Sequence, residues 1–189
     1  MSPPRHQAFA TLAHLDTWLR THHQREVELW VRIFKKDSGT ASVTWNDCVI
    51  ASLTWGWIDG QKRSLDAASF LQRLTPRRAR SSWSQRNREH AERLIADGRM
   101  QPAGLAQVEA AKRDGRWDRA YAGSASMEMP AEFLAALRKD KAAAKFYGTL
   151  NRANLYAIFH RVTTAVKAET RARRITTIVA KLSRGETFH

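Results

Sequence analysis

The chain has 189 residues, enough for one domain with a full core or for one domain with a helical extension. Its 32 Lys and Arg outnumber its 18 Asp and Glu, and the formal net charge of +14 favours anionic partners over cationic ones. A single cysteine indicates a reducing compartment and no apolar run reaches the ~20 residues of a membrane helix, so we expect a cytoplasmic protein without a membrane partner.

The first predicted elements are a helix, a strand and a second helix. Apolar residues at helical spacing predict a helix over residues 11–22, and alternating apolar residues predict a strand over residues 28–36. Thr44 and Asp47 have the spacing of a capping box, which predicts that the next helix begins there. Cys48 falls on the apolar side of this helix without a neighbouring histidine, so we expect it in the core rather than as a nucleophile.

A β-hairpin follows. Residues 57–63 and 69–75 predict its two strands, and Pro76 ends the second one. With the strand near 28–36 they predict a small antiparallel sheet with helices packed on it. From Ser84 onward the capping signals and apolar stripes predict helices. The predicted fold class is therefore α+β.

The predicted elements fall into two parts of one folding unit. Residues 1–122 form an α+β domain that contains the central hairpin and a basic loop. Residues 123–189 form a helical C-terminal part, which we expect to pack on that domain. Apolar stripes at 155–166 and 175–182 indicate its last two helices.

The first predicted strand of the hairpin has an unusual polar composition. In a regular strand alternate side chains share a face, so Trp57, Asp59, Gln61 and Arg63 are predicted to project together. An aromatic ring, a carboxylate, an amide and a guanidinium then line one concavity. The alternative is structural, with Trp57 in the core and Asp59 in a turn or a salt bridge.

Two segments carry nearly all of the net charge. Residues 62–88 hold eight Lys and Arg against Asp66, and residues 161–184 hold seven against Glu169, so the segments contribute +7 and +6. The loop 75–84 lies between a predicted strand and a predicted helix, whose N-terminal amides favour anions. We expect this basic loop to face solvent and to contribute to an anion site. The alternative is that its charges are only solvated surface.

The candidate ligand-binding residues combine tryptophans for stacking, arginines for anions and the polar strand face. They are Trp55, Trp57, Asp59, Gln61, Arg63, Arg73, Arg77, Arg78, Arg80, Trp83, Asn87 and Arg171. Arg171 falls on the apolar stripe of the last helix, where an arginine needs a fixed acceptor, and we predict Asp59 as that acceptor. Asp59 is also the one candidate for a catalytic acid or base. No cofactor and no metal site are predicted, because the histidines lack metal-ligand spacing and the strand face has one carboxylate.

Five segments form a distinctive ordered set along most of the chain. They are ELWVRIFKK (28–36), GWIDG (56–60), LTPRRARSSWSQRN (74–87), GRMQPAGLAQVEAAKRDGRWDRAY (98–121) and KAETRARRI (167–175). This set resembles the bacterial YdeI/OmpD-associated family, also called bacteriocin-protection proteins. The resemblance implies a link to protection against bacteriocins, antimicrobial peptides or stress. It implies no catalytic residues, cofactor or substrate.

Three classes of function remain open. The favoured one is a non-catalytic binding protein for an anionic small molecule or a nucleic acid, in which arginines contact phosphates and a tryptophan stacks on a ring. The second is an enzyme acting on a small anionic or aromatic compound, with Asp59 beside Arg63 and Arg73. The third is a stress-related adaptor whose helical half docks a protein. Direct capture of cationic peptides is disfavoured, because a chain at +14 repels them.

Overall fold

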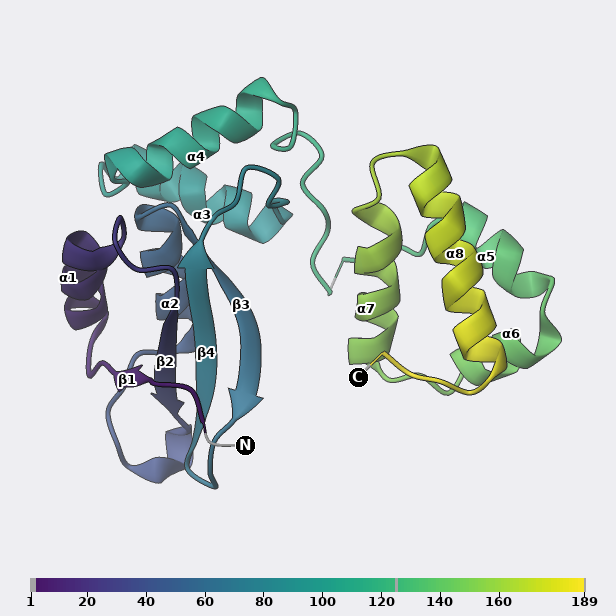
Figure 1. Cartoon of the computed structure of the whole chain (residues 1–189), viewed down its shortest axis with the longest axis horizontal. Coiled ribbons are helices and arrows are strands. Elements are labelled where there is room, and N and C mark those ends of the chain that lie inside the picture. The colour runs from purple at the N-terminus through teal and green to yellow at the C-terminus, as the bar shows by residue number, and fades with distance from the viewer. Residues whose placement is uncertain (1–2, 125, 189) are drawn as a thin grey trace. The chain divides into compact units, whose positions relative to one another are not determined.

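The computed structural model describes residues 3–124 and 126–188 (Figure 1). The chain forms two compact units, Met1–Arg119 and Ala120–His189, which we call the N-terminal unit and the C-terminal unit. The sequence places its division nearby, between residues 122 and 123. The packing of the helical part on the α+β part stays a prediction.

The N-terminal unit is an α+β structure, as predicted (Figure 1). Its elements are β1 (Gln7–Ala8), α1 (Leu12–His22), β2 (Leu29–Phe34), the 3₁₀ turn η1 (Lys36–Ser38), α2 (Trp45–Thr54), β3 (Trp57–Ser64), β4 (Ser69–Pro76), α3 (Gln85–Ala96) and α4 (Pro102–Arg113). The strand order is β1-β2-β4-β3, with β1 parallel to β2 and the other neighbours antiparallel. The sheet is thus mixed rather than antiparallel. The two-residue β1 is too short to give an alternating pattern in the sequence.

Local signals fix both ends of α2. The Thr44 hydroxyl accepts from the Asp47 backbone N–H at 3.1 Å, and the Asp47 carboxylate accepts from the Thr44 backbone N–H at 2.8 Å. The predicted capping box is therefore confirmed. At the other end Gly56 has a φ of +74°, and a Cβ there would lie 2.7 Å from the Ala103 carbonyl oxygen. Only glycine fits this passage from α2 into β3.

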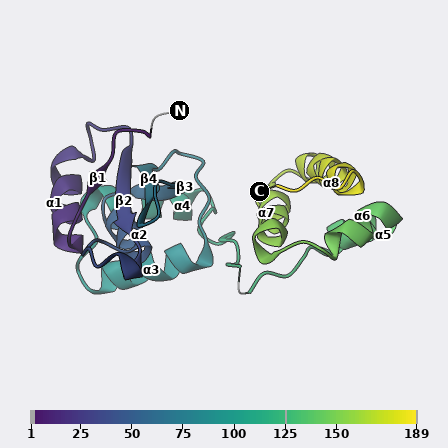
Figure 2. The same ribbon diagram turned by 90° about the horizontal axis from the view of Figure 1, so that it is seen from below.

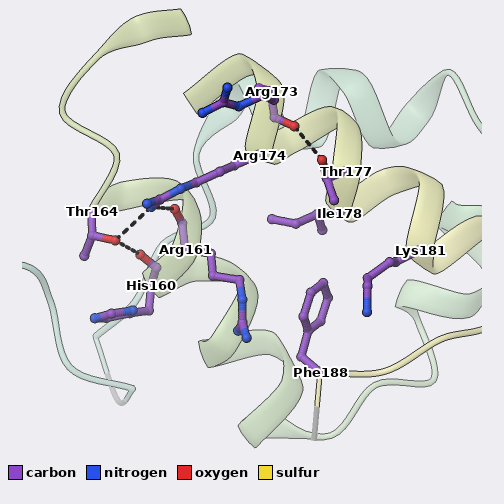
Figure 3. Close-up of a pocket in the computed structure, with 9 residues that line it drawn as sticks. All are labelled: His160, Arg161, Thr164, Arg173, Arg174, Thr177, Ile178, Lys181 and Phe188. Carbon is purple, nitrogen blue, oxygen red and sulfur yellow. Dashed lines mark hydrogen bonds between the residues drawn. The ribbon is translucent and has the colours of Figure 1, made fainter. Parts of the chain in front are cut away.

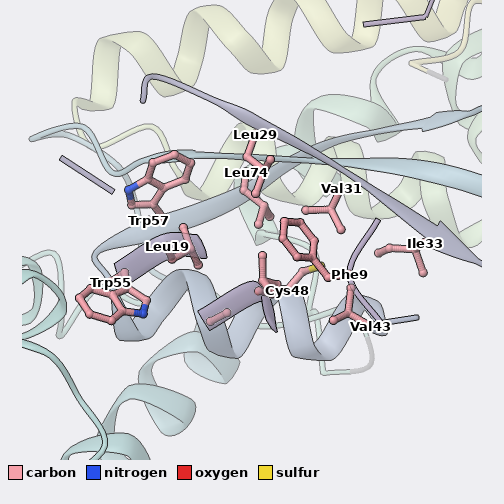
Figure 4. Close-up of a cluster of buried hydrophobic side chains, with 12 residues drawn as sticks. Phe9, Leu19, Leu29, Val31, Ile33, Val43, Cys48, Trp55, Trp57 and Leu74 are labelled. Atoms are coloured by element: carbon pink, nitrogen blue, oxygen red, sulfur yellow. The ribbon is translucent and has the colours of Figure 1, made fainter. Parts of the chain in front are cut away.

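One face of the sheet and the helices α1 and α2 enclose the core of the N-terminal unit (Figure 4). The core cluster comprises Phe9, Leu15, Leu19, Leu29, Val31, Ile33, Val43, Cys48, Ala51, Trp55, Trp57 and Leu74. Cys48 is fully buried, as predicted. Burial raises the pKa of its thiol to about 12, so the thiol stays protonated and unreactive near neutral pH.

The C-terminal unit is helical. It contains α5 (Ala131–Arg138), α6 (Lys141–Tyr147), α7 (Arg152–Thr163) and α8 (Ala168–Ser183). α8 packs against the other three helices (Figures 1 and 2). Residues of the predicted apolar stripes of α7 and α8 contribute to their common core. None of the helices in the described part of the chain has both the length and the apolar character needed to span a bilayer.

Candidate functional site

The hairpin does not present the predicted row of side chains, because its register shifts between Asp59 and Lys62. Asp59 pairs with Leu74, whereas Arg63 pairs with Leu71. Leu74 and Leu71 are three residues apart on β4 and so lie on opposite faces of the sheet, and paired residues share a face. The bulge therefore sends Asp59 and Arg63 to opposite faces, and the predicted single concavity is wrong.

A glycine and a buried amide stabilise this bulge. Gly60 lies within the shifted stretch, and its carbonyl accepts from the Gln72 side chain at 2.9 Å. Gln72 is only 2 % exposed, so its amide is an internal donor rather than a surface group. A glycine inside a strand is typical of a bulge, and the sequence therefore contained a signal against strict alternation.

Trp55 and Trp57 belong to the core of the N-terminal unit. They are 8 % and 1 % exposed. The indole N–H of Trp55 donates to Asp16 Oδ1 at 2.8 Å, and that of Trp57 donates to the His23 carbonyl at 3.1 Å. Both rings and both donors are used inside the fold. Neither residue offers the open stacking surface that the sequence suggested.

Asp59 lies on the core face, against α2. Its Oδ2 accepts from Trp45 Nε1 at 3.1 Å. Burial raises the pKa of Asp59 above its ordinary value, while the Trp45 bond and the charges of Arg77 and Arg86 act in the opposite direction. Arg63 lies on the other face of the sheet. The predicted catalytic arrangement of Asp59 beside Arg63 is therefore absent from the fold.

The other candidate ligand-binding residues of β3 and β4 are Gln61, Arg63 and Arg73, and they lie on the opposite face of the sheet. The guanidinium of Arg63 lies over the Trp30 ring, 4.9 Å from its centroid, and Arg63 Nε donates to Gln61 Oε1 at 3.1 Å. Arg73 forms an ion pair with Glu28 at 2.7 Å. These contacts cover this face of the sheet and stabilise it.

The basic loop is partly buried. Arg77 is only 7 % exposed, its guanidinium carbon lies 3.8 Å from the Trp83 ring centroid, and its Nη1 donates to the Ser82 carbonyl. The prediction of a wholly solvent-facing loop is thus wrong for Arg77, because stacking on Trp83 replaces its hydration. Arg78 and Arg80 are exposed, as predicted.

The last two candidates near the loop have structural contacts. Trp83 is 2 % exposed and packs edge-on against Trp117, with ring centroids 4.9 Å apart. The backbone N–H of Asn87 donates to the hydroxyl of the α3 cap Ser84 at 3.1 Å. Trp83 closes the loop onto the segment after α4, so its ring is not an open stacking surface.

Arg171 has a fixed acceptor, as predicted, but that acceptor is not Asp59. Its guanidinium pairs with Glu132 of α5 at 3.2 Å, and its Nε and Nη2 both donate to the Ala165 carbonyl at 3.2 Å. All three residues lie in the C-terminal unit. The helical spacing shows that this arginine needs an acceptor, but it does not show which acceptor is nearest in the folded chain.

A pocket of about 600 Å³ lies between α7, α8 and the C-terminal tail (Figure 3). We call it the α7–α8 pocket. It is lined by His160, Arg161, Thr164, Arg173, Arg174, Thr177, Ile178, Lys181 and Phe188. Four of these nine residues are Arg or Lys, and none is acidic.

Arg174 joins α8 to the end of α7. Its Nη1 donates to the Arg161 carbonyl at 2.7 Å and to the Thr164 hydroxyl at 3.3 Å, and Thr164 donates to the His160 carbonyl at 2.6 Å (Figure 3). The last carbonyls of a helix have no donors within the helix. Arg174 supplies one, and its guanidinium is therefore held in a fixed position at the pocket wall.

The tail residue Phe188 lies between two other cations of the pocket (Figure 3). The Arg161 guanidinium carbon is 4.6 Å and Lys181 Nζ is 5.4 Å from its ring centroid. The Phe188 backbone N–H donates to Oδ1 of the buried Asn154 at 2.9 Å. The tail is thus fixed to α7, and its aromatic ring separates the two positive charges.

Lys181 of the pocket has an acidic partner. Glu186 pairs with Arg184 at 2.6 Å and with Lys181 at 3.5 Å. By contrast, Arg161, Arg173 and Arg174 have no acidic partner within residues 3–124 and 126–188. Three guanidinium groups therefore leave their charge uncompensated around one cavity.

His160 adds a titratable group to this wall. Burial, together with Arg161 and Arg174, lowers the pKa of His160 below its ordinary value of 6.5. The imidazole packs edge-on against Tyr121, with ring centroids 4.8 Å apart. It is therefore neutral at pH 7 and becomes a further cation on acidification.

The α7–α8 pocket can act as an anion receptor. Its guanidinium, ammonium and hydroxyl groups are the donors that recognise phosphate, sulfate or carboxylate oxygens. In the part of the chain that the structure describes, no group of three or more His, Cys, Asp or Glu could hold a metal ion. The sequence identified the basic segment 161–184 but missed His160 and Phe188. Their place in the pocket depends on the packing of α7 on α8 and on the return of the tail.

Two protein families match the chain, one in each of the two structural units. Residues 7–107 match the family described as "Domain of unknown function (DUF8412)", and residues 126–185 match "Bacteriocin-protection, YdeI or OmpD-Associated". The second match confirms the family resemblance for the region that holds most of the α7–α8 pocket. Of the five segments that suggested the resemblance, only 167–175 lies inside it. Comparisons with curated proteins and with solved structures gave no match.

Proposed function

We propose that this chain, which belongs to the DUF8412 domain family through residues 7–107 and carries a YdeI or OmpD-associated region at residues 126–185, is a binding protein for a small phosphate-bearing anion. The α7–α8 pocket is the receptor. The observation that carries the proposal is the uncompensated charge of Arg161, Arg173 and Arg174 around one cavity of about 600 Å³.

The pocket residues divide into a fixed wall and adjustable arms. Arg174 is held by the end of α7, so it offers a preorganised donor that loses little freedom when an anion binds. Arg161 and Arg173 are exposed on α7 and α8 and can turn toward a ligand. Lys181 shares its charge with Glu186, so a bound anion competes with that carboxylate.

The description of the C-terminal family names bacteriocin protection. Capture of a cationic peptide by this pocket is disfavoured, since the chain carries a formal charge of +14 and the pocket lining has no acid. We infer that a protective role of this chain works through its anionic ligand. Nucleic acid, with the exposed Arg78 and Arg80 as contacts, is the alternative partner.

Calorimetric titration with inorganic pyrophosphate tests the proposal. The Arg161→Gln/Arg173→Gln variant removes two pocket charges that make no ion pair in the described residues. We expect it to weaken pyrophosphate binding by about tenfold at moderate salt, because each exposed guanidinium contributes up to ~1 kcal/mol. The binding should also weaken as salt is raised.

The matched control is Arg78→Gln/Arg80→Gln, which removes the same charge from the N-terminal unit. It should leave pyrophosphate affinity within about twofold of the parent, since neither residue lines the α7–α8 pocket. Equal losses in the two variants would show that only net charge matters. Selective loss in the control, for pyrophosphate or for a short single-stranded DNA probe, would place the main anion site on the basic loop instead.

A further inference from the structure

A second pocket, of about 500 Å³, lies in the N-terminal unit against α1, α2 and the connection between α3 and α4. We call it the α1–α2 pocket. Leu12 and Ala13 of α1 and Ile50 and Ala51 of α2 give it an apolar lining. Its lining also includes one carboxylate and one guanidinium, Asp16 and Arg99. All of these residues lie within the region matched by the DUF8412 family.

Asp16 is a positioned acceptor. Its Oδ1 accepts from the indole N–H of the buried Trp55 at 2.8 Å, and the Trp55 ring is packed against His23 at a centroid distance of 4.8 Å. The carboxylate is thereby held at the pocket. It makes no ion pair with any residue in 3–124 or 126–188.

The backbone that carries Arg99 is also held in place by hydrogen bonds. The N–H groups of Arg99 and Met100 both donate to the Leu94 carbonyl at 2.9 Å, and the N–H of Gln101 donates to the Thr54 carbonyl at 3.2 Å. The Arg99 guanidinium has neither a hydrogen bond nor an ion pair among the described residues. A positive and a negative group thus line the same cavity without neutralising each other.

We propose that the α1–α2 pocket binds a small zwitterion with an apolar side chain, of the α-amino acid class. Arg99 receives the carboxylate and Asp16 receives the ammonium group, while the apolar lining takes the side chain. Opposite charges that face one cavity without pairing match the two ends of such a ligand. A simple anion satisfies only Arg99 and leaves Asp16 unused. This site is separate from the anion receptor of the C-terminal unit.

Calorimetric titration of the full chain with L-leucine tests this assignment. Two analogues are the chemical controls: isocaproate, which lacks the amino group, and leucinamide, which lacks the carboxylate. We expect saturable binding of L-leucine and at least about tenfold weaker binding of both analogues, because each has lost one charge-assisted contact. Asp16→Asn and Arg99→Gln should each weaken L-leucine binding by a similar factor. The Asn side chain keeps an acceptor for Trp55, so the fold is retained.

Arg80→Gln is the matched surface variant and should bind L-leucine like the parent. The proposal is overturned if L-leucine does not bind at millimolar concentration. It is also overturned if isocaproate binds as well as L-leucine and Asp16→Asn changes neither, since the pocket is then an anion site alone. Unchanged L-leucine affinity in both Asp16→Asn and Arg99→Gln would place the ligand elsewhere. None of these outcomes depends on pyrophosphate binding at the α7–α8 pocket.

Discussion

The Arg77 guanidinium lies over the Trp83 ring, with its central carbon 3.8 Å from the ring centroid. Both side chains are buried, at 7 % and 2 % exposed. Arg77 therefore closes the 77–83 loop on itself, whereas its neighbours Arg78 and Arg80 face solvent. One sequence run of arginines thus contains two physically different groups.

Arg77→Ser should lower the free energy of unfolding by about 2 kcal/mol, because it removes a buried cation–π contact and a hydrogen bond to the Ser82 carbonyl. Arg78→Ser and Arg80→Ser should each change it by less than about 0.5 kcal/mol, as is usual for exposed positions. Chemical denaturation measures all three. Equal, small effects would show that the stacking contributes nothing to stability.

Asp59→Asn should stabilise the fold near pH 7. The folded-state pKa of Asp59 is raised by burial, so the folded chain binds this proton more tightly than the unfolded chain does. The stability linked to this proton is present below the unfolded pKa and is lost as the pH rises through the folded pKa. The asparagine carries no charge to bury and still offers an oxygen to Trp45 Nε1.

The gain from Asp59→Asn should shrink as the pH falls and should be smallest below the ordinary carboxyl value of 3.8, where the aspartate is protonated in both states. Denaturation curves at neutral and acidic pH measure the difference. A loss of stability at pH 7 would mean that Arg77 and Arg86 require the carboxylate charge more strongly than burial opposes it.

Arg171→Met should destabilise the fold by about 1 kcal/mol, because it leaves the buried Ala165 carbonyl without its guanidinium donors. Arg173→Met removes the same charge from the same helix and should cost less than about 0.5 kcal/mol. Glu132→Gln tests the ion pair alone, and its effect should also be small because both partners are partly exposed. A Glu132 effect as large as that of Arg171 would assign the stabilisation to the ion pair.

Sulfate affinity of the α7–α8 pocket should rise as the pH falls below 6.5. The lowered pKa of His160 keeps the imidazole neutral at pH 7, and protonation then adds a positive charge beside Arg161 and Arg174. Tyr121 and Tyr156 also pack on this ring. Sulfate keeps its charge over this pH range, so a titration at several pH values reports the protein. His160→Gln should flatten the dependence, and an unchanged slope in that variant would exclude His160 as its source.

Much of the fold could be predicted because its signals are local. Thr44 and Asp47 form the predicted capping box, and both ends of the hairpin strands β3 and β4 agree with the predicted ranges to within one residue. The alternation within β3 failed at Gly60, where a bulge exchanges the two faces of the strand. Strand periodicity predicts a face only while the register is unbroken.

The α7–α8 pocket was harder to predict from the sequence than the fold, because its residues are distant along the chain. The charges of Arg161, Arg174 and Lys181 were visible in the basic segment, but nothing local placed them around a shared cavity. The hydrogen bond from the Phe188 backbone N–H to Asn154, 34 residues earlier in the chain, helps to hold Phe188 at the pocket. The tryptophans and arginines clustered at 55–87 instead predicted a binding site in the N-terminal unit. In the structure most of them stabilise the core or the basic loop of that unit.

Glu186 of the C-terminal tail should compete with a bound anion for Lys181. Glu186→Gln removes the carboxylate that lies 3.5 Å from Lys181 Nζ. Pyrophosphate affinity should then rise by about threefold, since Lys181 becomes fully available and an exposed ion pair contributes up to ~1 kcal/mol. Calorimetric titration measures the change. A lower affinity would indicate that Glu186 positions the pocket rather than competing for it.

The most direct test of anion binding is an NMR titration of the ¹⁵N-labelled chain with inorganic pyrophosphate. It locates the ligand without any substitution. The amides of His160, Arg161, Thr164 and Thr177 should shift progressively and saturate together, whereas the amides of residues 77–88 should stay in place. Absence of saturable shifts in α7 and α8, or shifts concentrated in residues 77–88, would contradict the α7–α8 pocket as the anion receptor.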